Sequence, residues 1–236
     1  MTLEHNYKPR DWKVHPPVTD AERDAGNPRK PRQPMVPLSH TLSEITGPVY
    51  GHGALASGDD DLTRNAVRNG EPLGERIIVS GRVLDEDGRP LPDALIEIWQ
   101  ANAAGRYAHD GDGHDAPIDP NFMGTGRCVT DKDGRYRFTT IRPGSYPLPF
   151  GDNLWRPAHI HYSLFGPSFV SRLITQSYFP GDPLLEFDAM YNSIPDQGAR
   201  DRLIATFDRH AGTPGFALGY VFDIVLRGRN ATPLES

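Results

Sequence analysis

The sequence predicts a mainly β protein, a β-sandwich with long loops, and three observations support this class. Apolar residues make up only 37% of the 236-residue chain, whereas 23 prolines and 24 glycines make about a fifth of it turn-forming. Short runs rich in Val, Ile, Tyr and Phe recur along the chain. Turn signals separate these runs, a pattern that is typical of two packed sheets and not of a helical bundle.

The strand-like runs begin at residue 76. RIIVSGRVL (76–84) and ALIEIWQA (94–101) predict two strands joined by the turn DEDGRPLP. GRCVTD, the turn DKDG and RYRFTT (126–140) predict a hairpin, because Asp-Gly favours tight turns between paired strands. We expect three further strands at RPAHIHYSLFG (156–166), SRLITQSYF (171–179) and ALGYVFDIVLRG (217–228).

One segment has the pattern of a helix. In PDQGARDRLIATFDRH (195–210), Leu203, Ile204 and Phe207 fall on one helical face, which predicts a short helix in the C-terminal half. Residues 1–37 carry seven prolines and many charges with no periodicity, so they form an irregular arm that is either disordered or laid across a neighbouring subunit. We therefore divide the chain into a loop-rich N-terminal extension, 1–75, and a β-sandwich domain, 76–236.

Composition and motifs exclude several classes of function. A formal charge of −6 offers no basic patch for nucleic acid. The chain has no run of 18 apolar residues and no apolar leader region, so we expect a soluble, cytoplasmic protein without membrane contact. The single cysteine, Cys128, rules out an internal disulfide and is expected to be a small buried residue. Motifs of serine hydrolases and of zinc sites are absent, and DEDG and DKDG lack the distal glutamate of a calcium loop.

Two histidines and two tyrosines remain as candidate functional residues. His159 and His161 stand two residues apart in a strand-like run, so both imidazoles point to the same face. Tyr107 lies just past a strand end in AAGRYAHD. Tyr146 lies in RPGSYPLP, where prolines and a glycine restrict the backbone. Each of the four by itself is more often a packing residue than a ligand.

Taken together, the four residues indicate a metal site instead of packing. Two phenolates and two imidazoles suit a hard, oxidised cation such as Fe(III), whereas zinc more often takes Cys or carboxylate with His, and ferrous oxygenases take two His and one carboxylate. Coordination to such a cation would lower the pKa of each tyrosine far below its free value of about 10. Composition alone leaves this grouping open.

The same residues lie in a pattern that resembles a known family. VSGRVLDEDGRPLPDALIEIWQANAAGRY (79–107), which ends in Gly-x-Tyr, is similar to the signature of the intradiol ring-cleavage dioxygenases. Tyr146 and the Arg-Pro-x-His-x-His at 156–161 follow in the order that this family uses. The resemblance runs from about residue 76 to 228, and it implies a transthyretin-like (prealbumin-like) sandwich.

The resemblance also implies roles for individual residues. Tyr107, Tyr146, His159 and His161 would bind a non-haem Fe(III) ion, and Tyr146 would leave the ion to take a substrate proton. Arg156 would face the substrate ring, and Gln176 would lie near the oxygen-binding side. Trp99 would form a wall of the substrate pocket. Leu148 stands where the family often has tryptophan, which changes the expected shape of that pocket.

Within the family, the arm with DWKVHPP, the phrase GERIIVSGRV and the ending FDIVLRGR are similar to the iron-bearing chain of the protocatechuate-cleaving enzymes. This implies O2-dependent cleavage of 3,4-dihydroxybenzoate to 3-carboxy-cis,cis-muconate in the β-ketoadipate pathway of aromatic breakdown, with a homologous α chain as obligate partner. Two alternatives stay open. One is the same reaction on catechol, hydroxyquinol or another substituted catechol, and the other is a transthyretin-like binding module without iron.

Overall fold

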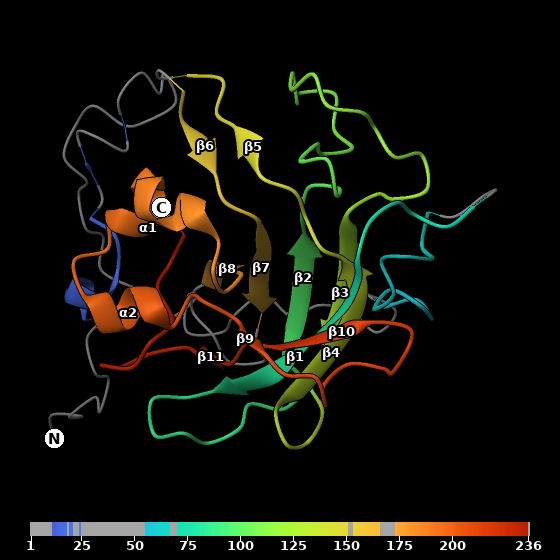
Figure 1. Cartoon of the computed structure of the whole chain (residues 1–236). Coiled ribbons are helices and arrows are strands. Elements are labelled where there is room, and N and C mark those ends of the chain that lie inside the picture. The colour runs from blue at the N-terminus through green and yellow to red at the C-terminus, as the bar shows by residue number, and fades with distance from the viewer. Residues whose placement is uncertain are drawn as a thin grey trace, which may run out of the picture.

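The structure, a computed structural model, describes residues 11–17, 19–20, 24, 55–66, 70–150, 153–165 and 173–235. Strands predominate, and the helices are short (Figure 1). The helical elements are η1 Trp12–Val14, η3 Pro183–Phe187, α1 Ala189–Asn192 and α2 Gln197–Asp201. The strands are β1 Arg76–Leu84, β2 Leu95–Trp99, β3 Thr125–Val129, β4 Arg135–Ile141, β5 Tyr146–Pro147, β6 Trp155–Arg156, β7 His159–Phe165, β8 Leu173–Tyr178, β9 Thr206–Phe207, β10 Leu218–Val221 and β11 Ile224–Val225.

The strands form two main sheets and a small ribbon. In the first sheet β1 pairs antiparallel with β4 on one edge and parallel with β10 and β11 on the other, and β9 joins β10. The second sheet has the order β3-β2-β7-β8, and all its pairs are antiparallel. The separate β5–β6 ribbon lies above the upper ends of β2 and β7 in Figure 1.

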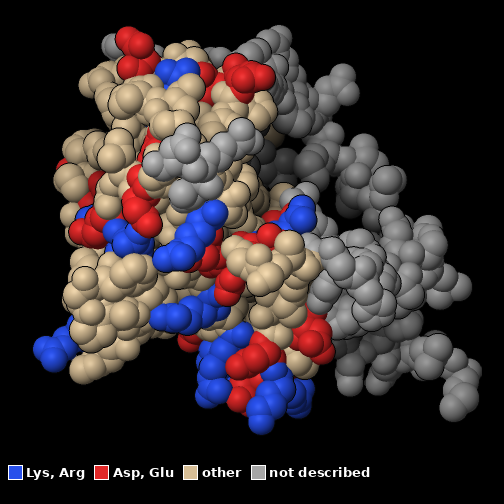
Figure 2. Space-filling model, turned by 90° about the vertical axis from the view of Figure 1, so that its right-hand side faces the viewer, with Lys and Arg blue, Asp and Glu red and all other residues tan. Residues whose placement is uncertain are grey.

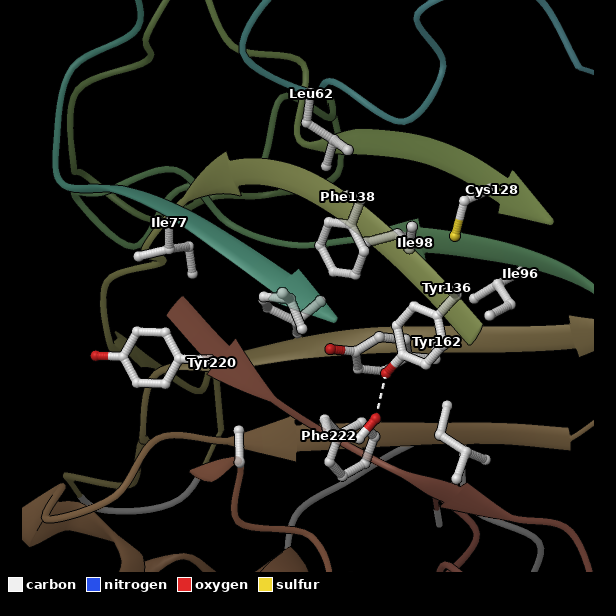
Figure 3. Packing of buried hydrophobic residues seen from close by; sticks show 14 of the residues in the cluster. Leu62, Ile77, Ile96, Ile98, Cys128, Tyr136, Phe138, Tyr162, Tyr220 and Phe222 are labelled. Atoms are coloured by element: carbon white, nitrogen blue, oxygen red, sulfur yellow. Dashed lines mark hydrogen bonds between the residues drawn. The ribbon is translucent and has the colours of Figure 1, made fainter. Parts of the chain in front are cut away.

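The core lies between the two sheets. It joins Ile77 and Phe138 of the first sheet with Ile98 and Tyr162 of the second, each no more than 2% exposed (Figure 3). Tyr136 lies in the same cluster, and its hydroxyl donates a hydrogen bond to the carbonyl of Phe222 at 2.5 Å. This packing confirms the predicted mainly β sandwich, while the transthyretin-like label stays a prediction.

Cys128 is one of the core residues, as expected. It lies on β3, is 6% exposed, and packs in the main cluster. Burial raises the pKa of its thiol to about 12, so the side chain acts as a small apolar group and not as a nucleophile.

The predicted hairpin over 126–140 is wrong. β3 pairs with β2 in the second sheet, whereas β4 pairs with β1 in the first. The turn between them therefore crosses from one sheet to the other. In this turn Gly134 has φ +70, and its carbonyl accepts a hydrogen bond from the N–H of Val83. Asp131 accepts the N–H groups of Asp133 and Arg135, which confirms DKDG as a turn. The local turn signal was correct, but pairing between the strands is decided by the whole sheet.

The turn DEDG has the same construction. Asp85 accepts the N–H groups of Asp87 and Arg89 at 2.8 Å, and Gly88 has φ +77. It joins β1 of the first sheet to β2 of the second.

Acidic and basic side chains lie side by side at the lower end of the face drawn in Figure 2, so this end shows no patch of one sign.

The predicted helix over 195–210 is much shorter in the structure. Only α2 is helical there, with Asp196 as its N-cap. The chain then leaves the helix because Leu203 O accepts the N–H of Tyr178 and Ala205 N–H donates back to Tyr178 O. Thr206 and Phe207 form β9 instead, and Phe207 is 48% exposed. Pairing with strand backbones outweighed the local helical pattern.

The other predicted strands are confirmed over their described residues, with two breaks. The first divides 156–166, because Arg156 belongs to β6 of the separate ribbon and β7 begins at His159. Residues 217–228 form two short strands, β10 and β11, along the same edge of β1. Between them the Asp223 carboxylate accepts the N–H of Arg82 at 2.8 Å. A Cβ on Gly81 would lie 1.9 Å from the carbonyl oxygen of Phe222, so only glycine fits at this crossing.

Part of the N-terminal extension packs on the sandwich. Leu62 is fully buried in the main core, its N–H donates to Thr139 O at 2.9 Å, and Asp61 bridges to Thr139. Val14 packs with Tyr178 in a second cluster that also holds Ala199 of α2. Most of residues 1–54 lies outside the described residues, so the division at residue 75 and the interface role of the arm stay predictions.

Across the described ranges, no helix has both the length and the apolar character needed to cross a membrane. Figure 1 shows the short helices α1 and α2 gathered on one flank, beside the β8 edge of the second sheet. The opposite face of that sheet forms the core. At this edge Tyr191 of α1 and Ala199 of α2 pack in one cluster with Tyr178 of β8.

Replacing Leu62 tests whether residues 55–66 belong to the folded core. Leu62→Ala should lower the free energy of unfolding by about 2–5 kcal/mol, because it leaves a cavity in a fully buried site. The matched control Leu73→Ala, at a side chain that is 71% exposed, should change it by no more than about 0.5 kcal/mol. Urea unfolding followed by fluorescence measures both, and equal midpoints would show that Leu62 does not contribute to the core.

Candidate metal centre

Two histidines lie on the face of the second sheet that points away from the core. On β7 the side chains of Ile160 and Tyr162 point into the core, and both are fully buried there. Alternation along a strand therefore places His159 and His161 together on the opposite face. They are only 2% and 6% exposed, so this second face is covered as well.

Strand register brings other predicted residues to the same face. Trp99 on β2 and Gln176 on β8 lie directly opposite His161, and Tyr178 lies opposite His159. Cross-strand partners share a face. The predicted Trp99 and Gln176 are thus neighbours of the histidine pair, and the Trp99 ring stacks on the His161 ring with centroids 4.8 Å apart and an interplanar angle of 1°.

The tyrosines come from two loops whose backbones touch. Gly105 has φ +82, and a Cβ there would lie 2.1 Å from the carbonyl oxygen of Ser145. In the other loop, a Cβ on Gly144 would lie 2.4 Å from the carbonyl oxygen of Ala103. Glycine at both positions allows the two loops to meet backbone to backbone. This contact brings together Tyr107 and Tyr146, each of which stands two residues after one of these glycines.

Local hydrogen bonds support the first loop. The side chain of Asn102 accepts the N–H groups of Ala104 and Arg106, and its backbone carbonyl accepts the N–H of Gly144. The N–H of Tyr107 donates to the Asp112 carboxylate at 2.8 Å. The rings of Tyr107 and Tyr146 meet edge to face with centroids 5.5 Å apart.

The four candidate donor atoms converge. The hydroxyl oxygen of Tyr107 lies 3.0 Å from Nε2 of His161, and that of Tyr146 lies 3.2 Å from Nε2 of His159. The two Nε2 atoms are themselves 3.1 Å apart. Residues separated by up to 54 positions thus place two oxygens and two nitrogens around one point.

The outer nitrogens of the two imidazoles determine their tautomers. Nδ1 of His159 lies 2.7 Å from the carbonyl oxygen of Pro157, and Nδ1 of His161 lies 2.8 Å from a carboxylate oxygen of Glu235. Both partners are acceptors, so each Nδ1 carries the proton and donates. Nε2 of each ring then faces the centre, and this nitrogen of an imidazole can bind a metal ion.

This donor set fits a hard cation. Two lone pairs only 3.1 Å apart repel each other unless protons or a cation lie between them. The two phenol protons can satisfy the nitrogens in the metal-free protein, and a single cation can replace both protons. No group of three or more His, Cys, Asp or Glu side chains within the described ranges is placed to hold a metal ion. At this point two tyrosine oxygens stand beside the two histidine nitrogens.

Burial opposes charge on these groups. Desolvation raises the pKa of Tyr107 and of Tyr146, although the positive charge of Arg156 acts in the opposite direction on both. Desolvation, and then Arg156, lowers the pKa of His159 far below its usual value, which keeps this imidazole neutral. Ionised phenols at this place therefore need a cation beside them.

Arg156 is part of a buried polar network beside the centre. Its side chain is 4% exposed and its Nε lies 3.3 Å from the carboxylate of Asp188, which is 1% exposed. Its Nη2 donates to Gln176 at 2.8 Å and to the Tyr178 hydroxyl at 3.2 Å. The Tyr178 hydroxyl donates to Asp188 at 2.9 Å. These bonds hold the guanidinium in one orientation.

Asp188 connects this network to the short helices. Its carboxylate also accepts the N–H of Met190 at 3.0 Å and so caps α1. Leu148 lies outside this network. It is half-buried, directly follows β5, and its N–H donates to the carbonyl of Leu154, the residue before β6. Its neighbour in sequence, Pro147, and Tyr146 pair with Trp155 and Arg156.

Three residues of this site were not predicted from the sequence. Tyr178 stands two positions after Gln176 on a strand, so its alternation pattern was a usable signal. Asp188 and Glu235 lie outside any strand-like run or motif. Only the folded chain brings their carboxylates to Arg156 and His161.

Comparison with known proteins agrees with this geometry. The family model described as Dioxygenase (Dioxygenase_C) matches residues 45–228, most of the chain. The chain belongs to the intradiol dioxygenase family. Enzymes of this family use non-haem iron, and the match includes every residue of the converging donor set.

Curated relatives of this intradiol dioxygenase have related activities. It is 58% identical over 227 residues to the protocatechuate 3,4-dioxygenase beta chain of Burkholderia cepacia, which covers 96% of both chains. It is 35% identical to hydroxyquinol 1,2-dioxygenase of Rhizobium sp. (strain MTP-10005) over 64% of the chain, and 33% identical to catechol 1,2-dioxygenase of Candida albicans over 72%. The chain spans about half the length of these last two relatives.

A solved structure of the family has a similar fold. The 3-chlorocatechol 1,2-dioxygenase from Rhodococcus opacus 1CP is 27% identical, with a TM-score of 0.56 over 77% of this intradiol dioxygenase and 70% of that chain. The two chains therefore share the fold over most of their length, and the unmatched parts of each chain differ.

The Arg156–Asp188 pair provides a stability test. Asp188→Asn should lower the free energy of unfolding by about 3–5 kcal/mol, because it leaves the buried guanidinium without its counter-charge. In the matched control Asp133→Asn, which breaks the exposed pair with Arg135, the change should not exceed about 1 kcal/mol. Urea unfolding measures both, and equal midpoints would contradict a structural role for Asp188.

Proposed function

We propose that this intradiol dioxygenase is the iron-bearing chain of an enzyme that cleaves 3,4-dihydroxybenzoate (protocatechuate) with O2 to 3-carboxy-cis,cis-muconate. The observation that carries the proposal is the likeness to the protocatechuate 3,4-dioxygenase beta chain, which extends over 96% of both sequences. Relatives that act on catechol or hydroxyquinol are less similar and are matched over about half of their own length. The convergence of two phenols and two imidazoles supports the same reaction class.

In this proposal Tyr107, Tyr146, His159 and His161 hold an Fe(III) ion. When bound, the ferric ion supplies a Lewis acid that withdraws electrons from a catechol and makes its ring reactive toward O2. The two histidines are suited to remain as fixed ligands, because Pro157 and Glu235 hold their outer nitrogens.

Tyr146 has the features of the proton acceptor. A catechol that binds through both oxygens must lose two protons, and a phenolate oxygen on Tyr146 can accept one of them. Tyr146 sits on the two-residue strand β5, which pairs only through the β5–β6 ribbon in the described residues. Tyr107, by contrast, is held by the Asp112 contact and the Asn102 turn.

Arg156 has a supporting electrostatic role. Its positive charge acts on Tyr107, Tyr146 and His159, so it favours ionised phenols and electron-rich groups near the centre. Burial beside Asp188, Gln176 and Tyr178 keeps water from screening this charge. We assign Trp99 to the wall of the substrate pocket because it stacks on His161, and Leu148 to its rim beside Tyr146.

A homologous α chain belongs to this proposal. The relative with 58% identity is named a beta chain, which implies a second kind of chain in its enzyme. We propose that such a partner contributes donors for the substrate carboxylate and that the N-terminal arm contacts it. The cytoplasmic location that we expect stays a prediction.

Iron binding tests the donor set directly. Purified protein, co-expressed with its α partner, should contain Fe(III) and show a red-brown absorption band from phenolate-to-iron charge transfer. Tyr107→Phe and His161→Ala should each lose most of this iron, since each removes one of four donors. Iron assay and visible spectroscopy measure both effects.

Matched controls distinguish the loss of an iron ligand from a general loss of structure. Tyr220→Phe, on β10 of the first sheet, and His210→Ala, an exposed residue, should leave iron content and the band unchanged. A colourless, iron-free wild-type protein would refute the ferric proposal and favour a binding module. Full iron content in both ligand variants would refute the assignment of the donors.

A panel of diols tests the substrate. We expect kcat/KM for protocatechuate to exceed that for catechol roughly 10-fold to 100-fold, because a charge-assisted hydrogen bond to the substrate carboxylate contributes about 1.5–3 kcal/mol. Hydroxyquinol and 3-chlorocatechol complete the panel. A preference for catechol or hydroxyquinol would contradict the protocatechuate assignment while leaving the ferric centre intact.

A further inference from the structure

A carboxylate from the far end of the described chain lies behind one of the proposed iron ligands. An oxygen of Glu235 is 2.8 Å from Nδ1 of His161, although 74 positions separate the two residues. The side chain of Glu235 is 21% exposed and that of His161 is 8% exposed. The contact is therefore mostly shielded from water, where a charge-assisted hydrogen bond is strong.

The segment that carries Glu235 is held along its length by hydrogen bonds to two strands. Its N–H donates to Ile174 O on β8 at 2.8 Å, which aligns it with the strand next to β7. The other bonds join Thr232 N–H to Val225 O, Val225 N–H to the Thr232 hydroxyl, the Thr175 hydroxyl to Pro233 O, and Leu234 N–H to Nδ1 of His15. Ala231 and Thr232 are 1% exposed. This anchoring positions the carboxylate as firmly as a strand residue.

The charges at the centre also include Glu235. Its negative charge raises the pKa of both Tyr107 and Tyr146 in the metal-free protein, so it lies within electrostatic reach of both phenols. Two phenolates and this carboxylate carry three negative charges, which a trivalent cation neutralises and a divalent one does not. Arg156 and Asp188 neutralise each other.

We propose that Glu235 is a positioning residue that orients His161 and supplies the third negative charge that favours Fe(III) over a divalent ion at this centre. The inference rests on the proposed ferric function. The carboxylate holds the Nδ1 proton, so Nε2 faces the centre, and it makes the imidazole a stronger donor. Its charge also stabilises the ferric state relative to the ferrous state.

Three proteins, each co-expressed with the α partner, test this role: wild type, Glu235→Gln and Glu235→Ala. Glutamine keeps an acceptor for Nδ1–H and removes the charge, whereas alanine removes both. We expect iron release to a chelator to be roughly 10-fold to 100-fold faster in the alanine variant, with glutamine between alanine and wild type. In both variants the charge-transfer band should move to longer wavelength and the reduction potential to more positive values, because the iron receives less electron density.

The control Glu186→Gln removes an exposed carboxylate elsewhere and should match wild type in all three measurements. Thermal unfolding of the iron-free proteins reports any structural loss. Unchanged iron release, band and potential in both Glu235 variants would overturn the inference. A shift in unfolding temperature without a shift in band or potential would also overturn it, since Glu235 would then act only on the fold. An iron-free wild type would instead defeat the proposed function itself.

Discussion

The structure depends on a single strand that is buried on both faces. β7 directs Ile160 and Tyr162 into the core and His159 and His161 to the opposite side. A slip of one residue in its pairing would exchange the two sets and place imidazoles in the apolar core. The cost of that exchange is large, since buried polar groups without partners are strongly unfavourable. The packing that forms the sandwich therefore also sets the direction of the histidine pair.

The remaining donors depend on backbone contact instead of strand alternation. Gly105 and Gly144 let two loops approach until no side chain fits between them, and each loop carries a tyrosine close by. Loops are usually variable in conformation. Here the side chain of Asn102 accepts two N–H groups within the first loop, and its carbonyl accepts the N–H of Gly144 in the second. The centre thus combines one rigid strand with two loops that are rigid for a different physical reason.

Electrostatics explains why so many charged groups lie behind the donors. In a site closed to water an uncompensated charge is costly, and Arg156 is tolerated because Asp188 lies 3.3 Å away. The carboxylate of Glu235 accepts a hydrogen bond from His161, and its charge lies near the centre, where a cation would balance it. Desolvation opposes ionised phenols in the metal-free protein. The arrangement therefore fits the ion that enzymes of this family use.

Local patterns in the sequence predicted most of the strands and turns and named the four residues whose donor atoms converge. Alternation reports burial along a strand, and Asp-Gly reports a turn, because both are local properties. Local patterns did not show which strands pair, and the prediction of a hairpin over 126–140 failed for that reason. They also did not show that the backbone of Tyr178 would bond to Leu203 and Ala205, which ends the helix early. Tertiary structure alone brought Asp188 to Arg156 and Glu235 to His161. Contacts across tens of residues depend on the path of the whole chain, and no local pattern in the sequence encodes them.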